Sequence, residues 1–522
     1  MAATNSLRPD SNAGASKHHL AISIAVSLFA FVTCYFRTFI FPGTPLLPNG
    51  DQTGFVYAGS RIAAGELPYR DYFQIVPPGT DLTYALMIRA FGLRLWIPHI
   101  AMALLAAVAA LLMTRIALRV LPGTAAALPG LLLIGFVLPE SADATHHWFS
   151  TVVALAAVFV LLGGSTLGRA TAAGALCGLT ACFTQTKGAA MVAAFCIFFA
   201  WEAGLHKSSA AAVVRQCAVL GALAAITFAA FNIYFVAAAG LRQWWFCIIV
   251  YPLRYYSAPS VNNWRVLEHD FGWHGGLIKW IAYPFIYATV PLACIVFLAV
   301  TRRRWKDGDE PWRQLVLIAL TGCFMFLPVV LAPSVKRVGS VAPLAMISLA
   351  WLLYRSGPLL RLFRQGLAIG TVALAVAVPV RTQTHWHAFL DLPAGRTAFH
   401  EKAQLEEYAW VLTHTHPGQF FSGMPPMFVP FHLVNPSAIA GYDTTEYTRP
   451  EQISELLQSL RTHTVPLMIL PSEQKYLHPT GLPSDHLGPF RDYLYSNYVL
   501  TQTFPSGDEV WEQKADANAA SQ

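Results

Sequence analysis

Runs of roughly 20 apolar residues recur from about residue 20 to about residue 381, and they constrain the fold of this chain more than any other feature. An α-helix rises about 1.5 Å per residue, so a run of this length crosses the hydrocarbon core of a bilayer. Charged residues make up only 12% of the sequence, about half the share found in soluble globular proteins. The sequence therefore predicts an all-α membrane protein with about eleven transmembrane helices.

The loops between these runs indicate how the helices are oriented. The spans are expected near residues 20–41, 95–118, 123–138, 148–164, 170–185, 188–204, 211–239, 277–300, 313–332, 338–354 and 366–381. Lys and Arg concentrate in alternate loops, which predicts a cytoplasmic N-terminal tail, residues 1–19. The first run is too long for a signal-peptide core and lacks a small-residue cleavage site, so we expect it to be retained as a helix. An odd number of spans then exports the C-terminus across the plasma (inner) membrane.

The net charge of +7 does not indicate a nucleic-acid partner, because most of the Lys and Arg residues lie in these short loops. Polar residues become frequent from about residue 382. Predicted helices (residues 401–414 and 450–462) alternate there with predicted strands (residues 418–423 and 466–470), followed by a terminal hairpin at residues 498–511. Residues 382–522 are therefore expected to form a small extracytoplasmic α/β domain. It has no glycine-rich phosphate fingerprint and no nucleophile elbow, so we expect the chemistry to lie in the membrane domain, residues 20–381.

The first outward loop, residues 42–94, carries the most informative motifs. It contains NGDQ at residues 49–52, GELPYRDYF at residues 65–73 and PPGT at residues 77–80, before a short interfacial helix expected at residues 80–91. This pattern resembles the GT-C superfamily of membrane glycosyltransferases, which includes protein O-mannosyltransferases and the lipid A aminoarabinose transferases. The layout of many helices, this loop and a soluble C-terminal domain resembles that superfamily as well. The resemblance implies a GT-C-like fold and a polyprenyl-phosphate sugar as donor.

Asp51, just beyond the first span, is the candidate catalytic residue. A carboxylate held at the membrane face can act as general base toward an acceptor hydroxyl, and partial desolvation raises its pKa. The resemblance implies this role for Asp51. The alternative is structural, because Asp is favoured at helix N-caps and a helix is expected at residues 52–64. In the same loop, Tyr69 and Asp71 are candidate substrate-binding residues, although Arg70 and Asp71 would also form a simple loop contact.

The second outward loop gathers ionisable residues beside apolar helices, a pattern often found at functional sites. These residues are Glu140, Asp143, His146 and His147. Adjacent side chains on a helix point about 100° apart, so the two histidines cannot both face one site. We expect Asp143 or His146 to line the substrate site. A divalent metal, Mg²⁺ or Mn²⁺, is left open: some GT-C members use one, but this chain lacks a clear paired DxD motif.

Three basic residues, Lys187, Lys336 and Arg337, are expected on the outward side, where the positive-inside rule disfavours them. Binding the phosphate of a lipid-linked donor explains their presence, since Lys and Arg form charge-assisted hydrogen bonds with phosphate oxygens. The resemblance agrees, because a cation before a helix that contains a proline (Pro343) recurs in GT-C proteins. For Lys187, the alternative is a side chain that reaches the lipid headgroups.

These features lead to three hypotheses. The first is a glycosyltransferase that moves a hexosyl or pentosyl group from polyprenyl phosphate to an extracytoplasmic glycan, lipid or protein, with inversion at the anomeric carbon. In that case the aromatic-rich segment at residues 240–276 is expected to line a substrate entrance. The second is a transporter or flippase of lipid-linked glycans, which fits less well because no internal repeat is evident and the charges lie at the outer face. The third is an inactive scaffold with the same fold.

Overall fold

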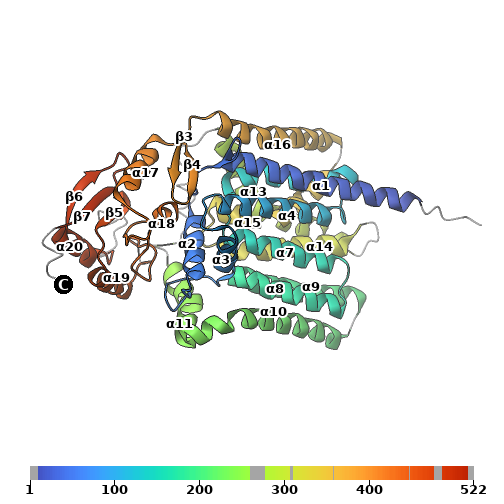
Figure 1. Cartoon of the computed structure of the whole chain (residues 1–522). Coiled ribbons are helices and arrows are strands. Elements are labelled where there is room, and N and C mark those ends of the chain that lie inside the picture. The colour runs from blue at the N-terminus through green and yellow to red at the C-terminus, as the bar shows by residue number, and fades with distance from the viewer. Residues whose placement is uncertain are drawn as a thin grey trace, which may run out of the picture.

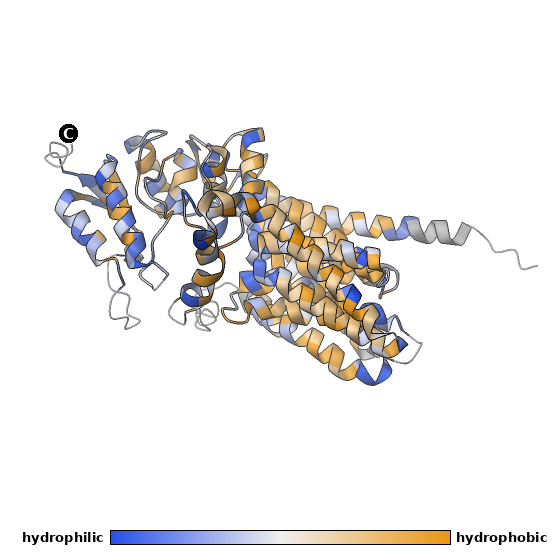
Figure 2. Cartoon of the chain, turned by 90° about the horizontal axis from the view of Figure 1, so that it is seen from below, coloured by the Kyte–Doolittle hydropathy of each residue, from blue (hydrophilic) through white to orange (hydrophobic). Residues whose placement is uncertain are grey.

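The structure, a computed structural model, describes residues 10–207, 209–258, 261, 277–305, 310–356, 358–445, 447–474 and 485–514. Two parts lie side by side in Figure 1, a bundle of long helices and a smaller part made from the C-terminal residues. Helices α2 (Asp51–Ala63) and α3 (Gly79–Phe91) lie between them. Hydrophobic residues dominate the bundle in Figure 2, and hydrophilic residues are more frequent in the C-terminal part.

Within the described residues, nine helical segments are long and apolar enough to cross a membrane. They are Lys17–Thr38, Ile97–Ala117, Gly123–Ser141, Gln185–His206, Ala210–Ala239, Trp280–Arg304, Trp312–Val329, Val335–Arg355 and Leu360–Thr384. Two further apolar helices, α7 (His146–Leu162) and α8 (Leu167–Phe183), have 17 residues each. Every predicted span overlaps one of these segments, so the predicted helical membrane domain is confirmed.

The long helices of the bundle are α1 (Asp10–Thr38), α4 (Ile97–Ala117), α9 (Gln185–His206), α10 (Ala210–Ala239), α13 (Leu277–Thr301), α14 (Trp312–Phe326), α15 (Val335–Arg355) and α16 (Pro358–Thr384). Short segments accompany them: η1 (Gly123–Ala127), α5 (Leu128–Leu132), η2 (Leu133–Val137), α6 (Leu138–Ser141), α11 (Leu241–Trp245), η3 (Phe246–Val250), η4 (Pro252–Tyr256), η5 (Arg302–Arg304) and η6 (Leu327–Val329). The span at residues 123–141 is divided because Pro129 and Pro139 lack the N–H that a continuous helix needs.

Small residues let helices α8 and α10 approach each other closely. Gly174 and Gly178 stand four positions apart on α8, the spacing of the GxxxG packing motif of membrane helices. A Cβ atom on Gly174 would lie 2.4 Å from the carbonyl oxygen of Leu220, and one on Gly178 would lie 2.4 Å from that of Ala224. The two backbones are therefore in direct contact, and even an alanine does not fit at either position.

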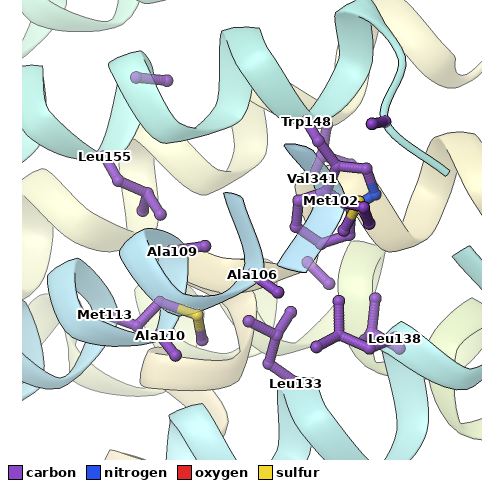
Figure 3. Packing of buried hydrophobic residues seen from close by; sticks show 14 of the residues in the cluster. Met102, Ala106, Ala109, Ala110, Met113, Leu133, Leu138, Trp148, Leu155 and Val341 are labelled. Carbon is purple, nitrogen blue, oxygen red and sulfur yellow. The ribbon is translucent and has the colours of Figure 1, made fainter. Parts of the chain in front are cut away.

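The buried core around α4 is also built from small side chains and the larger ones that pack against them. Its labelled members in Figure 3 are Met102, Ala106, Ala109, Ala110, Met113, Leu133, Leu138, Trp148, Leu155 and Val341. They come from α4, η2, α6, α7 and α15. Because lipid tails are as apolar as leucine, such helices are held together mainly by close packing rather than by exclusion of water. This core packs together helices that carry the candidate site, among them α15.

The first outward loop begins with a hairpin of β1 (Phe39–Ile40) and β2 (Thr44–Pro45) and continues through α2 and α3. Helix α3 confirms the short helix predicted at residues 80–91. The loop is also tied to the C-terminal part of the chain. Leu47 N donates to Ala398 O at 3.0 Å, and Thr397 Oγ1 donates to Pro45 O at 3.0 Å.

The C-terminal part contains α17 (Lys402–His414), α19 (Pro450–Thr462) and an antiparallel sheet with strand order β5-β7-β6, formed by β5 (Leu467–Leu470), β6 (Tyr498–Thr503) and β7 (Glu509–Gln513). These elements confirm both predicted helices, one predicted strand and the hairpin. The strand predicted at residues 418–423 is wrong, because that segment forms only isolated bridges to Val434 and Met468. Sequence reasoning missed the hairpin of β3 (Ala388–Leu392) and β4 (Gly395–Phe399), and also α18 (Pro425–Phe431), η7 (Ser472–Gln474) and α20 (Gly488–Asn497).

The contact between α8 and α10 generates a prediction with a built-in control. Gly178→Ala should lower the stability of the folded protein by about 1–3 kcal/mol, since its methyl group collides with the backbone of α10. Gly221→Ala on α10 should be neutral or slightly stabilising, because nothing lies within 4 Å of its added Cβ. The measurement is the thermal unfolding midpoint of each variant in the same detergent. Equal midpoints for the two variants would contradict the close approach of α8 and α10.

Candidate active site

Asp51 is the first residue of α2, and its side chain is exposed. The N-cap position is held by Gly50, with φ 68°, and no side chain caps the helix. The alternative that Asp51 serves as the N-cap is therefore wrong. Gly50 suits the site for two reasons: glycine adopts positive φ without strain, and any Cβ there would lie 2.9 Å from Lys336 Nζ. The backbone thus brings Asp51 close to the first turn of α15.

Asp51 lines a cavity of about 580 Å³ between the first outward loop and the C-terminal part of the chain. The loop contributes Gly50, Asp51, Phe55, Tyr57, Arg61, Tyr72 and Gln74, among others, and the C-terminal part contributes Met424, Tyr442, Asp443, Tyr447 and Gln452, among others. Sequence reasoning missed Tyr442, Asp443 and Tyr447. The only signal in the sequence was a polar turn at residues 441–448, and no local pattern connects that turn to Asp51.

Asp143 and Lys336 form an ion pair beside Gly50. Lys336 Nζ lies 3.1 Å from Asp143 Oδ2, and the Asp143 side chain is almost fully buried. Burial raises the pKa of Asp143, while the nearby Lys336 ammonium acts to lower it. Arg37 at the end of α1 adds another positive charge nearby and donates to Leu138 O at 2.5 Å. The predicted candidates Asp143 and Lys336 therefore meet next to Asp51.

Arg337 follows Lys336 on the first turn of α15. Its guanidinium donates to Ala332 O at 3.2 Å and to the hydroxyl of Tyr256, and it also lies 5.5 Å from the centre of the Tyr256 ring. Tyr256 ends η4, which belongs to the aromatic-rich segment expected at the substrate entrance. Residues 259–260 and 262–276 of that segment lie outside the described residues. Ala332 and Tyr256 thus hold the Arg337 guanidinium at the start of α15.

Lys187 lies inside the bundle rather than in an outward loop, which corrects the prediction. It occupies the first turn of α9 and is fully buried. Its ammonium donates to His147 O at 2.9 Å, to Thr151 Oγ1 at 3.1 Å and to Ser340 Oγ at 3.2 Å. Three protein acceptors satisfy its three N–H groups, which leaves none for a phosphate or a lipid headgroup. Lys187 instead connects α7, α9 and α15.

The other candidates of the second outward loop point away from a common site. His146 Nδ1 lies 2.9 Å from Thr184 Oγ1, and its ring lies 5.3 Å from that of Phe55, which lines the cavity. Glu140 accepts a hydrogen bond from the Tyr283 hydroxyl at 3.0 Å. His146 thus stands behind the cavity wall, and Glu140 faces α13.

Potential metal ligands in the described part of the chain are the side chains of His, Cys, Asp and Glu. Within the described residues, no group of three or more His, Cys, Asp and Glu side chains is arranged to hold a metal ion. The carboxylate nearest to Asp51 in the second loop, Asp143, is already paired with Lys336. The described residues therefore offer no preformed set of three protein ligands for Mg²⁺ or Mn²⁺.

Tyr69 and Asp71 line a second, larger cavity of about 1020 Å³. Asp71 Oδ2 lies 2.7 Å from Arg70 Nη2 and accepts from Leu67 N at 2.7 Å, so the predicted alternative of a loop contact is confirmed. Tyr69 is buried at φ 70°, and its hydroxyl donates to Val76 O at 2.8 Å. Neither residue lines the cavity of Asp51.

No protein-family model and no curated protein matches this chain. Solved structures do match, among them two of ArnT. ArnT from Cupriavidus metallidurans bound to undecaprenyl phosphate matches with a TM-score of 0.59 and 13% identity, over 95% of this chain and 98% of the ArnT chain. The same protein in the apo state matches with a TM-score of 0.56 and 12% identity, over 96% and 99% of the two chains. The chain therefore has the fold of ArnT, which confirms the predicted GT-C-like fold.

The ion pair beside Gly50 generates a prediction with a definite pH dependence. Lys336→Met should lower stability near neutral pH by about 1–2 kcal/mol, because it leaves a buried carboxylate without its cation. Without Lys336 the pKa of Asp143 rises further, so the loss should shrink as the pH falls and Asp143 takes up a proton. Adding Asp143→Asn should recover most of the loss.

Thermal unfolding of the two single variants and the double variant measures the coupling of the pair. The exposed pair of Arg396 and Asp391, 4.0 Å apart, provides the control. Arg396→Gln should leave the midpoint unchanged, since such surface pairs contribute little. Strictly additive effects of Lys336→Met and Asp143→Asn on the unfolding midpoint would contradict an energetic coupling between the two side chains.

Proposed function

We propose that this chain, which has the GT-C fold, is a membrane glycosyltransferase that moves a sugar from a polyprenyl-phosphate donor to an extracytoplasmic acceptor. The observation that carries the proposal is the cavity beside Asp51, which adjoins a cationic helix end at the rim of the membrane bundle. The fold supports it as well, since ArnT with this fold binds undecaprenyl phosphate. The transferred group is proposed to be hexosyl or pentosyl, and the acceptor a glycan, a lipid or a protein.

Asp51 is proposed as the general base. Its carboxylate would take the proton of the acceptor hydroxyl while that oxygen attacks the anomeric carbon of the donor. The bond between the anomeric carbon and the phosphate oxygen breaks in the same step, and the electron pair leaves with polyprenyl phosphate. A single displacement of this kind inverts the anomeric centre. The exposure of Asp51 supports this role, because the acceptor must reach its carboxylate.

Arg337 and Lys336 are proposed to hold the phosphate of the donor. The leaving phosphate gains negative charge during the reaction. Charge-assisted hydrogen bonds therefore stabilise the phosphate more strongly in the transition state than in the bound donor. Lys336 supports this role because 43% of its side chain remains exposed beside its partner Asp143. Asp143 would then tune and orient Lys336 rather than contact the sugar, and His146 would support the cavity wall through Phe55.

The proposed orientation gives the membrane domain and the C-terminal domain separate compartments. Residues 1–19 would be cytoplasmic, residues 20–381 with the outward loop at 42–94 would form the membrane domain, and residues 382–522 would form the extracytoplasmic domain. The protein would then lie in the plasma (inner) membrane with its site at the outer face, where a lipid-linked sugar presents its phosphate.

Transfer by purified protein in lipid tests the proposed base. Asp51→Asn should reduce kcat for transfer from a radiolabelled polyprenyl-phosphate sugar by at least about 100-fold, the scale of lost general-base catalysis. Binding of undecaprenyl phosphate should stay close to that of the wild type. The matched control is Asp391→Asn, which changes an exposed aspartate distant from the cavity in sequence and outside its lining.

Equal transfer by the wild type and Asp51→Asn would remove Asp51 as the base. Movement of the labelled lipid across the bilayer without any transfer would support the transporter hypothesis instead. A wild-type protein that binds the donor but neither transfers nor moves it would support the inactive scaffold.

Reporter fusions test the proposed orientation. Alkaline phosphatase fused after Thr384, at the end of α16, should be active because it is exported. The same enzyme fused after Lys207, between α9 and α10, should be inactive because that loop is expected in the cytoplasm. The reverse pattern of activities would contradict the orientation.

A further inference from the structure

Asp81 on α3 is fully buried and has no cationic partner among the described residues. Its Oδ2 atom accepts hydrogen bonds from Gln74 Nε2 at 2.9 Å and from the Tyr72 hydroxyl at 3.4 Å. Its Oδ1 atom has no hydrogen-bond partner in the described part of the chain, and the neighbouring Thr80 hydroxyl has none either. Burying a carboxyl group in this way is unfavourable for folding, so the position calls for a functional explanation.

The two side chains that Asp81 holds belong to the cavities. Gln74 lines the smaller cavity, which also contains Asp51, and Tyr72 lines both cavities. The residues common to the two linings are Arg61, Tyr72, Phe73, Ile439 and Gln452. These five residues, here called the shared wall, separate the smaller cavity from the larger one.

Arg61, itself part of the shared wall, holds Tyr72 from the side opposite to Asp81. The Arg61 guanidinium lies 4.9 Å from the centre of the Tyr72 ring, donates to Ser437 O at 3.1 Å and pairs with Glu66 at 2.6 Å. Tyr72 is thus held between Arg61, which reaches the C-terminal part of the chain, and the buried carboxyl of Asp81. Without Asp81, neither the Tyr72 hydroxyl nor the Gln74 amide would have this acceptor.

We propose that Asp81 is a positioning residue for the proposed transfer reaction, which fixes Tyr72 in the shared wall and Gln74 beside it in the smaller cavity, so that two substrates meet in one geometry. The inference rests on the proposed function for its catalytic consequence. A displacement of about 1 Å in groups that orient reactants is enough to reduce a rate by about 100-fold. Asp81 itself contacts no substrate, because it is fully buried.

The surroundings of Asp81 make this role dependent on pH. Burial raises the pKa of Asp81 to about 7, while the hydrogen bonds from Gln74 and Tyr72 act in the opposite direction. The titratable groups around Asp81 and its donors are Tyr69, Tyr84 on α3 and Arg61 on α2, and Cys182 on α8 and Cys247 on η3 lie near Tyr69. The tyrosines and cysteines among these groups are neutral near pH 7, and Arg61 contacts Tyr72 rather than Asp81. Asp81 is therefore the group in this cluster whose charge changes near pH 7.

The sign of the effect follows from this raised pKa. In the unfolded chain a carboxyl ionises near its ordinary pKa of about 3.9. The folded protein therefore loses stability as the pH rises from about 4 to about 7, and the loss is complete above that range. Over the upper part of the same range the ionised carboxylate strengthens its hydrogen bonds to Tyr72 and Gln74, which tightens the shared wall.

Asp81→Asn keeps the shape and an acceptor oxygen but removes the charge. Its unfolding midpoint should exceed that of the wild type near pH 8, and the difference should shrink as the pH falls and disappear below about pH 4. Wild-type kcat should rise severalfold between about pH 6 and about pH 8, whereas the variant should lack this rise and keep its donor KM within about twofold. The matched control is Thr80→Val, which removes the adjacent buried hydroxyl and should leave both pH profiles unchanged.

Asp81→Leu tests the positioning without any assay of transfer. Hydrogen–deuterium exchange of the peptides that cover residues 69–76 should become at least about tenfold faster in this variant, because both donors lose their acceptor. Unchanged exchange would overturn the positioning role, even if the wild type transfers sugar normally. If Asp81→Leu does not fold, identical pH profiles of Asp81→Asn and the wild type would overturn it instead. Absence of transfer by the wild type would remove the proposed function, and the exchange and stability measurements would still decide whether Asp81 holds the wall.

Discussion

The ion pair between Asp143 and Lys336 is the contact on which the geometry of the candidate site depends. It joins the loop before α7 to the first turn of α15, directly beside Gly50 at the start of α2. Three segments that are far apart in the sequence therefore meet at one charged contact. The Asp143 side chain is buried, whereas 43% of the Lys336 side chain is exposed, so the pair is partly desolvated. Removing either side chain therefore destabilises the other. The position of Asp51 relative to the cationic end of α15 follows from this contact.

The basic residues near the helix ends beside the candidate site form two groups, which differ in their hydrogen-bond acceptors. All three N–H groups of Lys187 donate to protein acceptors, and the buried side chain connects α7, α9 and α15. Its partner Ser340 also donates to Arg337 O at 2.7 Å, so the buried lysine supports the turn that carries the outer cations. Lys336 and Arg337 keep partners at the rim of the bundle instead. A buried cation thus holds α15, and two further cations lie at the N-terminal end of that helix.

The sequence predicted the membrane helices well because a bilayer imposes a length and a polarity that any apolar run must satisfy. It also identified Asp51, Lys336 and Asp143 as candidates, since charges next to apolar runs stand out. It also named Asp71, because an acidic motif looks the same in sequence whether or not its charge is neutralised by its neighbour Arg70. Asp81 was missed since a single acid at the start of a short helix reads as a favourable first-turn residue. Helix α8, which packs against the start of α3, lies far from Asp81 in the sequence, and no local pattern reveals contacts of that range.

The C-terminal part of the chain completes the cavity rather than merely adjoining it. Tyr57 of α2 stacks on Phe428 of α18 with ring centres 4.6 Å apart, and its hydroxyl accepts a hydrogen bond from Asn435 N at 3.0 Å. This contact sets α2 against the segment that leads to Tyr442 and Asp443. Asp443 Oδ1 accepts a hydrogen bond from Thr445 N at 3.1 Å, which stabilises the turn that contains both residues. Asp443 is exposed and lines the cavity. The wall opposite Asp51 therefore exists only while the C-terminal part is docked on α2, so the polar environment of the proposed base is a property of both parts of the chain together.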